Sequence, residues 1–212
     1  MSFCSDFESL FELTTRVYLE EPLHKCDIIY VFGQSVNHQQ SNIKRAIELY
    51  GRGLASRIGI ADFKKLHGYA GVRSLRSSLE HHSIPKSRII AVPPALSDFP
   101  PSTDAEATGL VRLAHKMGWQ RLIITSPPIH QFRAFISTIS AAKRESLKLK
   151  IYNSVGLPLK WCEDTVHSQG IEKGLRKDLL RSGEWLRLIR YHAKGDLISA
   201  DEAIEYLNLR DS

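Results

Sequence analysis

The chain alternates short apolar runs with amphipathic segments at intervals of about 30 residues, and this repeat constrains its fold more than any other feature. The apolar runs occupy residues 27–32, 57–61, 88–92, 121–125 and 147–152, and helical patterns occupy 43–51, 68–81, 103–117 and 130–144. Alternating strands and helices are typical of βαβ crossovers, and continuously apolar strands are typical of a sheet covered on both faces. We therefore predict an α/β fold, a Rossmann-like three-layer sandwich with a mostly parallel sheet of about five strands.

Further helices are predicted at both ends of this core. Residues 5–20 place apolar side chains at helical spacing, which predicts an N-terminal amphipathic helix. The pattern of 162–193 predicts a long helix interrupted at glycines, and Ser199 with Glu202 forms a capping box that predicts a last short helix. The sequence thus predicts one domain over 1–212, with a core at 27–152 and a helical tail at 153–212.

The composition excludes several classes of protein. Hydrophobic residues make up 42% of the 212 residues, which is enough for a full core, so disorder is excluded as the dominant state. No window reaches the roughly 18 to 20 apolar residues of a membrane span, and the acidic N-terminus is unlike a secretory signal, so we expect a cytoplasmic protein with no transmembrane segment. Cys4, Cys26 and Cys162 lack the spacing of a metal site, so we expect free thiols and no metal.

The positive charge is concentrated in the C-terminal third. Residues 143–194 hold twelve Lys and Arg against six Asp and Glu, while the rest of the chain holds 17 of each, so this segment accounts for the whole net charge of +6. A basic face can attract nucleic acid, acidic lipid headgroups or phosphorylated substrates, or it can be a solvated helix face. Basic residues are not interleaved with aromatic ones, so no nucleic acid is expected.

In a parallel sheet, ligands bind beyond the carboxyl ends of the strands, near the point where the strand order reverses. The first such loop begins with Gly33, Gln34 and Ser35, followed by a helix expected to begin near Ser41 or Asn42. Backbone amides in that position form a candidate anion site. An ordinary strand-to-helix turn explains the same residues.

The second and third loops contribute carboxylates and hydroxyls. Asp62 ends the second apolar run, where an acidic residue commonly binds ribose hydroxyls; a helix cap or a surface carboxylate is the alternative. The proline-rich third loop ends at Ser102 and Thr103, and Glu106 lies in the first turn of the helix that follows. These three are candidate ligand-binding residues, and helix capping accounts for them without a ligand.

The fourth loop is the most informative. Thr125 and Ser126 place two hydroxyls at the carboxyl end of a strand, and a helix follows with His130 and Arg133 in its first turn. Residues three apart share a helix face, so the imidazole and the guanidinium should project together. Histidine exchanges protons near neutral pH, and arginine binds phosphate through two hydrogen bonds. We therefore predict catalytic roles for His130, Ser126 and Thr125 and an anion-binding role for Arg133; the alternative is ordinary packing at a helix start.

Several of these segments resemble the YdcF/SanA/ElyC-like bacterial family over residues 27–191. The family's apolar strand ending in glycine, its arginine and its L-Y-x-x-G helix end are matched by 28–33, Arg45 and 49–53. Its T-S-x-x-H-x-x-R-A segment is resembled at 125–134, where three residues instead of two separate Ser126 from His130, and its E-W…Y helix is resembled by Glu184, Trp185 and Tyr191.

Two positions depart from the family pattern. Ser-Gly-Gly usually follows the second strand of the family, where this chain reads I-A-D-F at 60–63, and Ala105 replaces the first carboxylate of its acidic helix motif. The resemblance implies a Rossmann-like fold with a nucleotide-sized cleft. It adds Arg45 to the candidate ligand-binding residues, and because one relative is described as binding S-adenosylmethionine, it makes that molecule a candidate ligand.

Taken together, these features predict an enzyme that acts on an anionic, phosphate- or nucleotide-bearing small molecule by hydrolysis or group transfer. His130 would be the general acid or base, and Arg133, Arg45 and the amides of 33–35 would hold the anion. A divalent ion on Asp62 or Glu106 has no support from ligand spacing. Two alternatives stay open: a module that binds S-adenosylmethionine or a nucleotide without turnover, and a protein-interaction role through the basic helical tail.

Overall fold

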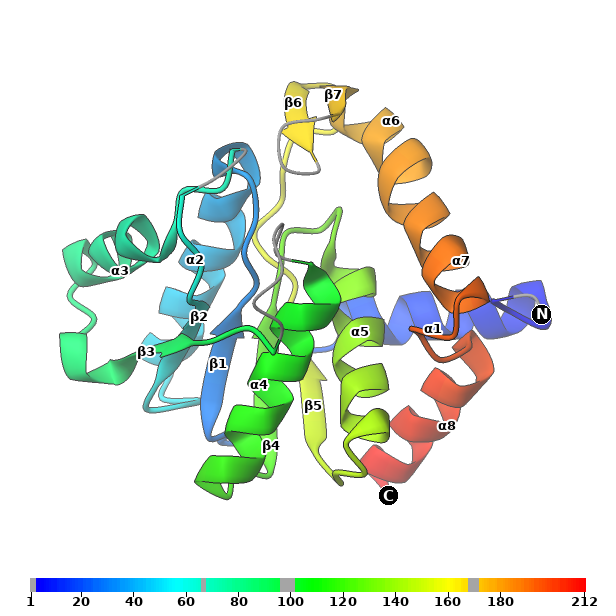
Figure 1. Cartoon of the computed structure of the whole chain (residues 1–212), viewed down its shortest axis with the longest axis horizontal. Helices are drawn as coiled ribbons and strands as arrows, with labels where there is room; N and C mark the ends of the chain where they lie inside the picture. Colours follow the sequence, from blue (N-terminus) through cyan, green and yellow to red (C-terminus); the bar gives the residue numbers. More distant parts are fainter. Residues whose placement is uncertain (1–2, 66–67, 96–101, 168–171) are drawn as a thin grey trace.

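The core of the computed structural model is a five-stranded sheet in which every strand pair is parallel. The structure describes residues 3–65, 68–95, 102–167 and 172–212. The strand order is β3-β2-β1-β4-β5, so the order reverses between β1 and β4 (Figure 1). The strands are β1 (Ile28–Val31), β2 (Ile58–Ala61), β3 (Ile89–Val92), β4 (Arg121–Thr125) and β5 (Lys150–Asn153). This arrangement confirms the predicted Rossmann-like sandwich.

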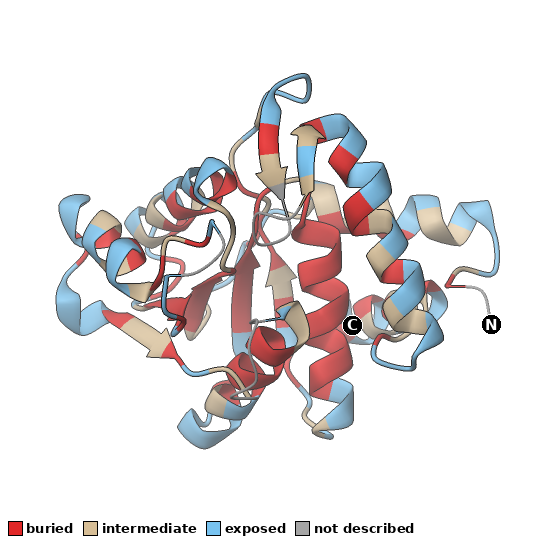
Figure 2. Cartoon of the chain, turned by 45° about the horizontal axis from the view of Figure 1, so that its top comes forward, coloured by how far each residue is buried: buried red, intermediate tan, exposed pale blue. Residues whose placement is uncertain are grey.

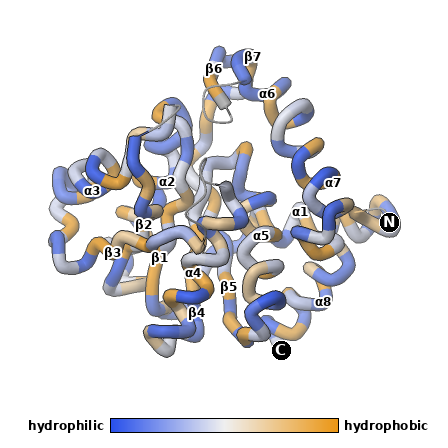
Figure 3. Tube along the Cα trace, in the orientation of Figure 1, coloured by the Kyte–Doolittle hydropathy of each residue, from blue (hydrophilic) through white to orange (hydrophobic). Residues whose placement is uncertain are grey.

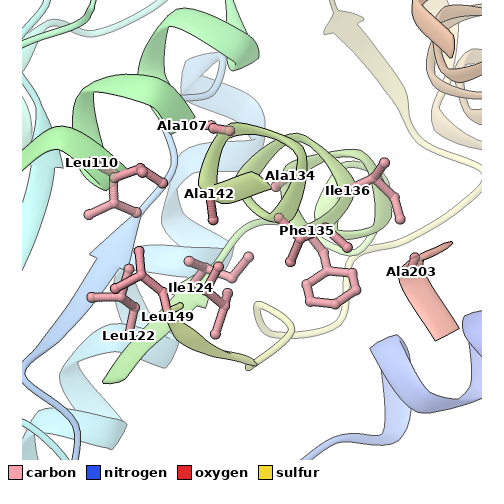
Figure 4. Packing of buried hydrophobic residues seen from close by; sticks show 14 of the residues in the cluster. Ala107, Leu110, Leu122, Ile124, Ala134, Phe135, Ile136, Ala142, Leu149 and Ala203 are labelled. Atoms are coloured by element: carbon pink, nitrogen blue, oxygen red, sulfur yellow. The ribbon is translucent and has the colours of Figure 1, made fainter. Parts of the chain in front are cut away.

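Helices cover both faces of the sheet, which explains why its strands are continuously apolar. On one face, α2 (Val36–Gly51) and α3 (Val72–His81) share a buried cluster with strand residues such as Ile29 and Ile60. On the other, α4 (Thr103–Met117) and α5 (Gln131–Arg144) share a second cluster, in which Figure 4 shows Leu110, Ile124 and Phe135. Helix α5 is buried along most of its length (Figure 2) because it is enclosed by other helices as well as by the sheet.

The enclosure of α5 is completed by the two ends of the chain. Helix α1 (Phe7–Leu19) packs on both α5 and α8 (Ala200–Asp211). The predicted capping box is present, because Ser199 Oγ accepts from the amide of Glu202 and the Glu202 carboxylate accepts from the amide of Ser199. Along the helices around the sheet, hydrophilic stretches are interrupted by hydrophobic ones, as expected for helices with one buried side (Figure 3).

The prediction of a long helix over 162–193 is wrong in its first half. An antiparallel hairpin of β6 (Asp164–His167) and β7 (Glu172–Leu175) stands there, and the chain becomes helical only at α6 (Arg176–Leu179). A six-residue π-helical segment, Leu180–Trp185, then leads into α7 (Leu186–Ala193). The hairpin forms because the segment has no apolar stripe of helical period, and its Thr165 and Val166 are β-branched residues that favour strands.

Four smaller boundaries also differ from prediction, one of them that of α3, which begins at Val72 rather than at residue 68. Helix α2 begins at Val36 rather than near residues 41–43, because its first turns bury the polar side chains of Gln39 and Asn42 instead of apolar ones. Strand β5 begins at Lys150 rather than at 147, and β3 is preceded by a 3₁₀ turn, Lys86–Arg88. None of the described helices is long and apolar enough to cross a membrane.

Candidate functional site

Four side chains meet beyond the carboxyl ends of β1 and β4, where the strand order reverses. We call them the His130 cluster: Thr103, His130, Arg133 and Glu184. Thr103 is the first residue of α4, His130 immediately precedes α5, and Glu184 comes from the π-helical segment. His130, Arg133 and Glu184 are buried, whereas Thr103 is half-buried. The cluster lies where an open α/β sheet places its ligands.

The imidazole of His130 is held on both sides. Its Nδ1 lies 3.0 Å from Glu184 Oε2, and its Nε2 lies 3.4 Å from Thr103 Oγ1. A proton on Nδ1 is donated to the Glu184 carboxylate and leaves Nε2 as an acceptor for the Thr103 hydroxyl. Carboxylate, imidazole and hydroxyl then stand in the order of a hydrolase triad.

Arg133 is bonded to the same carboxylate and the same hydroxyl. Its Nε and Nη2 donate to Glu184 Oε2 and Oε1 at 2.6 and 2.8 Å, and its Nη1 donates to Thr103 Oγ1 at 2.5 Å. Nη2 also lies 3.0 Å from His130 Nδ1, so an unprotonated Nδ1 accepts from Arg133 instead of donating to Glu184. The guanidinium of Arg133, predicted to bind an anionic ligand, is therefore engaged by Glu184.

The charge of this cluster is nearly balanced. Burial alone would raise the pKa of Glu184, but the guanidinium of Arg133 and the imidazole of His130 hold it well below its ordinary value. Glu184 is consequently ionised and compensates the positive charge of Arg133. The pair leaves the hydroxyl of Thr103 in contact with a cation at Arg133 and a base at His130.

A second buried carboxylate, Glu106, ties this region to the first loop. Its Oε1 accepts from the amide of Gly33 at 2.8 Å and from the hydroxyl of Tyr30 at 2.9 Å. Burial raises the pKa of Glu106 to about 8, against the opposing effects of these two hydrogen bonds and of Arg133. Gly33 is required here, because a Cβ would stand 2.9 Å from the ring of Tyr69. The Gly33 amide, predicted to bind an anion, is thus engaged by Glu106.

The rest of the first loop is bonded within the protein. The amide of Gln34 donates to Gln39 Oε1, whose amide nitrogen in turn reaches the carbonyl of Phe32. Ser35 donates to the carbonyl of Val166 in the β6–β7 hairpin. These bonds follow from the early start of α2, which brings its first turn against the strand end.

The two hydroxyls at the end of β4, on its last residue Thr125 and on Ser126, lie apart from this hydrogen-bonded network. Thr125 and Ser126 are fully buried, and within the described residues neither hydroxyl has a hydrogen-bond partner. The amide of Ser126 is bonded to Gln131 Oε1, which holds the turn into α5. It is Thr103, and not Thr125 or Ser126, that stands next to the His130 imidazole.

Three other predicted residues lie outside the His130 cluster, and one of them, Ser102, directly precedes Thr103 in the chain. Arg45 donates to the carbonyl of Val155 and pairs with Glu48, and Asp62 is exposed after β2. Ser102 accepts from the amide of Ala105, so it caps α4 as the structural alternative predicted. In the part of the chain that is described, no hydrogen bond or ion pair joins these residues to the cluster.

The residue that the site prediction missed is Glu184. It lies 51 residues beyond Arg133, in a segment whose pattern indicated only a helix, and the E-W pair of the family resemblance was the one signal that singled it out. Gln39 and Gln131 were also missed; each sits in the first turn of a helix and bonds the strand end before it.

Among the residues described, no group of three or more His, Cys, Asp or Glu side chains is placed to hold a metal ion. The three cysteines are free. Comparison of the chain with protein-family models, curated proteins and solved structures gives no significant match. The likeness to the YdcF/SanA/ElyC-like family therefore rests on the motifs quoted above.

Proposed function

We propose that this protein hydrolyses or transfers a phosphate-bearing group of a small molecule, with Thr103 as the nucleophile, His130 as the general acid and base, and Glu184 orienting the imidazole. The observation that carries the proposal is the alignment of Glu184 Oε2, His130 and Thr103 Oγ1 at 3.0 and 3.4 Å. A hydroxyl next to a base that is itself oriented by a third group is the arrangement that activates weak nucleophiles.

The chemical step follows from these contacts. Thr103 Oγ1 forms a bond to phosphorus as the bond from phosphorus to the leaving oxygen breaks, and its proton passes to His130 Nε2 and then to that leaving oxygen. A water molecule, deprotonated by the same nitrogen, then attacks phosphorus as the bond from phosphorus to Thr103 Oγ1 breaks. The proton passes from His130 Nε2 to Oγ1, which restores the hydroxyl and releases phosphate. An acceptor hydroxyl in place of water gives group transfer.

Two features support an anionic substrate at Thr103. The N-terminus of α4, a helix of 15 residues, begins at Thr103 and carries partial positive charge. Arg133 Nη1 reaches the same hydroxyl and favours its deprotonated form. Glu106, mostly protonated below its pKa of about 8, adds little negative charge beside them.

The experiment measures hydrolysis of p-nitrophenyl phosphate and of bis-p-nitrophenyl phosphate by matched variants. Thr103→Val and His130→Gln should each lower the rate at least about 100-fold, whereas Thr103→Ser should keep measurable activity. The controls are Thr125→Val and Ser126→Ala, which remove the hydroxyls at the end of β4 and should leave the rate unchanged. Full activity of Thr103→Val, with loss of activity in either control, would contradict the proposal and identify Thr125 or Ser126 as the nucleophile.

A second candidate function, binding of S-adenosylmethionine or a nucleotide without turnover, is favoured by one observation. Asp62 is exposed directly after β2, the strand next to β1, where an acidic side chain commonly binds ribose hydroxyls. On this alternative, S-adenosylmethionine or ATP raises the melting temperature, and Asp62→Asn abolishes the rise while His130→Gln retains it.

A further inference from the structure

A hollow of about 460 Å³ borders the Arg133–Glu184 pair, and Thr103 is not among the residues that line it. It is enclosed by α1, by the start of α5 and by the chain from α6 to α7, which Figure 1 shows running from the hairpin toward α1. This volume lies within the range of small-molecule sites. The lining consists of Leu10, Thr14, Tyr18, Ile129, Phe132, Arg133, Trp161, Leu180, Arg181, Glu184, Trp185 and Leu188.

The walls of the hollow are apolar and partly aromatic. The π-helical segment contributes Leu180, Arg181, Glu184 and Trp185 to one wall, so four of its six residues line the hollow. Single π-helical turns inside helices are frequent at functional sites. The local backbone irregularity and the hollow therefore coincide.

The polar groups on the inner wall are already paired. Arg133 and Glu184 neutralise each other, and Tyr18 donates its hydroxyl to the carbonyl of Pro128 at 2.9 Å. Burial raises the pKa of Tyr18 to about 12, so it stays a neutral donor in this bond. A ligand that reaches this wall is offered apolar contact and a compensated ion pair, which suits a hydrocarbon chain and not a polar group.

The rim is different, because it carries a cation. Arg181 is exposed, and no described residue forms a hydrogen bond or ion pair with its guanidinium. Trp161 stands at the same hollow with 42% of its surface exposed. An anionic group at the rim would complement Arg181, while the chain attached to it fills the apolar interior.

We infer that this hollow binds an apolar chain that ends in a carboxylate or phosphate, with the chain among Leu180, Trp185 and Leu188 and the anion at Arg181. The site goes beyond the proposed hydrolysis. Neither Thr103 nor His130 lines it, whereas Arg133 and Glu184, which contact these two residues, do.

The hollow provides its own optical probe, because Trp161 and Trp185 line it while Trp119, the third tryptophan, is buried elsewhere in the core. The experiment titrates the protein with dodecanoate and with dodecyl phosphate, each below its critical micelle concentration, and with methyl dodecanoate below its solubility limit. Tryptophan emission and calorimetry report binding. We expect dodecanoate or dodecyl phosphate to bind, the stronger of the two identifying the headgroup, and the neutral ester to bind at least about tenfold more weakly.

Three variants test the placement. Thr14→Phe fills the hollow from α1 without changing the charge and should abolish binding. Arg181→Ala should weaken binding of the anionic amphiphile at least about tenfold while leaving binding of the ester unchanged. Arg190→Ala, an exposed arginine outside the lining, is the matched control and should bind like wild type.

The inference is overturned if no amphiphile changes the emission, if Thr14→Phe binds as wild type does, or if Arg181→Ala and Arg190→Ala behave alike. Circular dichroism and melting temperature confirm that each variant is folded. Hydrolysis of p-nitrophenyl phosphate by Thr14→Phe separates the two proposals, because loss of the amphiphile site leaves the Thr103 reaction intact.

Discussion

The guanidinium of Arg133 and the carboxylate of Glu184 form a two-point ion pair, Nε to Oε2 at 2.6 Å and Nη2 to Oε1 at 2.8 Å, between residues 51 positions apart. This buried pair joins α5 to the π-helical segment, and it both contacts the proposed nucleophile at Thr103 and lines the apolar hollow. Stability, proposed chemistry and proposed ligand binding therefore depend on the same contact.

Removing one partner of this pair should be costly. Glu184→Gln leaves the buried charge of Arg133 without its counter-ion, and we expect the free energy of unfolding to fall by about 3 to 5 kcal/mol. The double variant Arg133→Met with Glu184→Leu should recover most of this loss while remaining inactive. Urea unfolding of the full mutant cycle measures the coupling. The control is Glu145→Gln, which breaks an exposed pair with Arg112 and should cost about 1 kcal/mol or less.

The same pair predicts sensitivity to acid. Because the pKa of Glu184 is held below its ordinary value, its contribution to stability is present above the unfolded pKa and is lost as pH falls through the folded pKa. The double variant should therefore lose less stability than wild type between pH of about 5 and about 2. Equal acid sensitivity of the two proteins, measured by urea unfolding, would contradict the ionised state of Glu184.

Glu106 should have the opposite pH dependence. Its pKa in the folded state is about 8, above the ordinary 4.5, so its contribution is full below about 4.5 and is lost as pH rises toward 8. Gln keeps an acceptor for the amide of Gly33 and the hydroxyl of Tyr30 but does not ionise. As pH rises through this window, the free energy of unfolding of Glu106→Gln should thus increase relative to that of wild type by up to about 1.4 kcal/mol per pH unit. Parallel stability curves for the two proteins between pH of about 5 and about 9 would refute the raised pKa.

Much of the fold was predictable because local pattern and tertiary environment agree. The apolar runs became the five strands, and α4 and α5 begin and end within a residue of their predicted bounds because capping and periodicity mark them. The β6–β7 hairpin was not predictable, since its polar sequence carries little periodicity and its pairing is set by where the chain leaves the sheet.

The candidate site was predictable only in part. His130 and Arg133 share a helix face by their spacing alone, but the partner of both, Glu184, is brought there by tertiary packing. Likewise, Gln39 lies before the predicted start of the helix near Ser41, although it is a buried residue of α2 whose side-chain amide donates to the carbonyl of Phe32. Long-range polar pairs of this kind leave no periodic signal in a sequence.

Gly109, inside α4, should be more important for stability than a glycine in a helix usually is. Alanine usually stabilises a helix interior by about 1 kcal/mol relative to glycine, but a Cβ at Gly109 would overlap the carbonyl oxygen of Pro93. Gly109→Ala should therefore destabilise by roughly 1 to 3 kcal/mol, since backbone must move. Gly51→Ala, at the open end of α2 where a Cβ meets nothing within 4 Å, is the control and should be neutral or slightly stabilising. Equal melting temperatures for the two variants would contradict the close approach of α4 to the end of β3.

The hydroxyl of Thr125, which has no hydrogen-bond partner among the described residues, gives the last prediction. A buried hydroxyl without a hydrogen bond costs about 1 to 3 kcal/mol, and Thr125 stands on a central strand where valine is equally well accommodated. Thr125→Val should therefore raise the free energy of unfolding by about 1 kcal/mol or more. The matched control is Thr138→Val in α5. The hydroxyl of Thr138 donates to the carbonyl of Ala134 at 2.7 Å, so its removal should lower the free energy of unfolding. Urea unfolding of both variants measures the effect. A destabilised Thr125→Val would contradict the prediction, because it would mean that the Thr125 hydroxyl is hydrogen-bonded in the native protein.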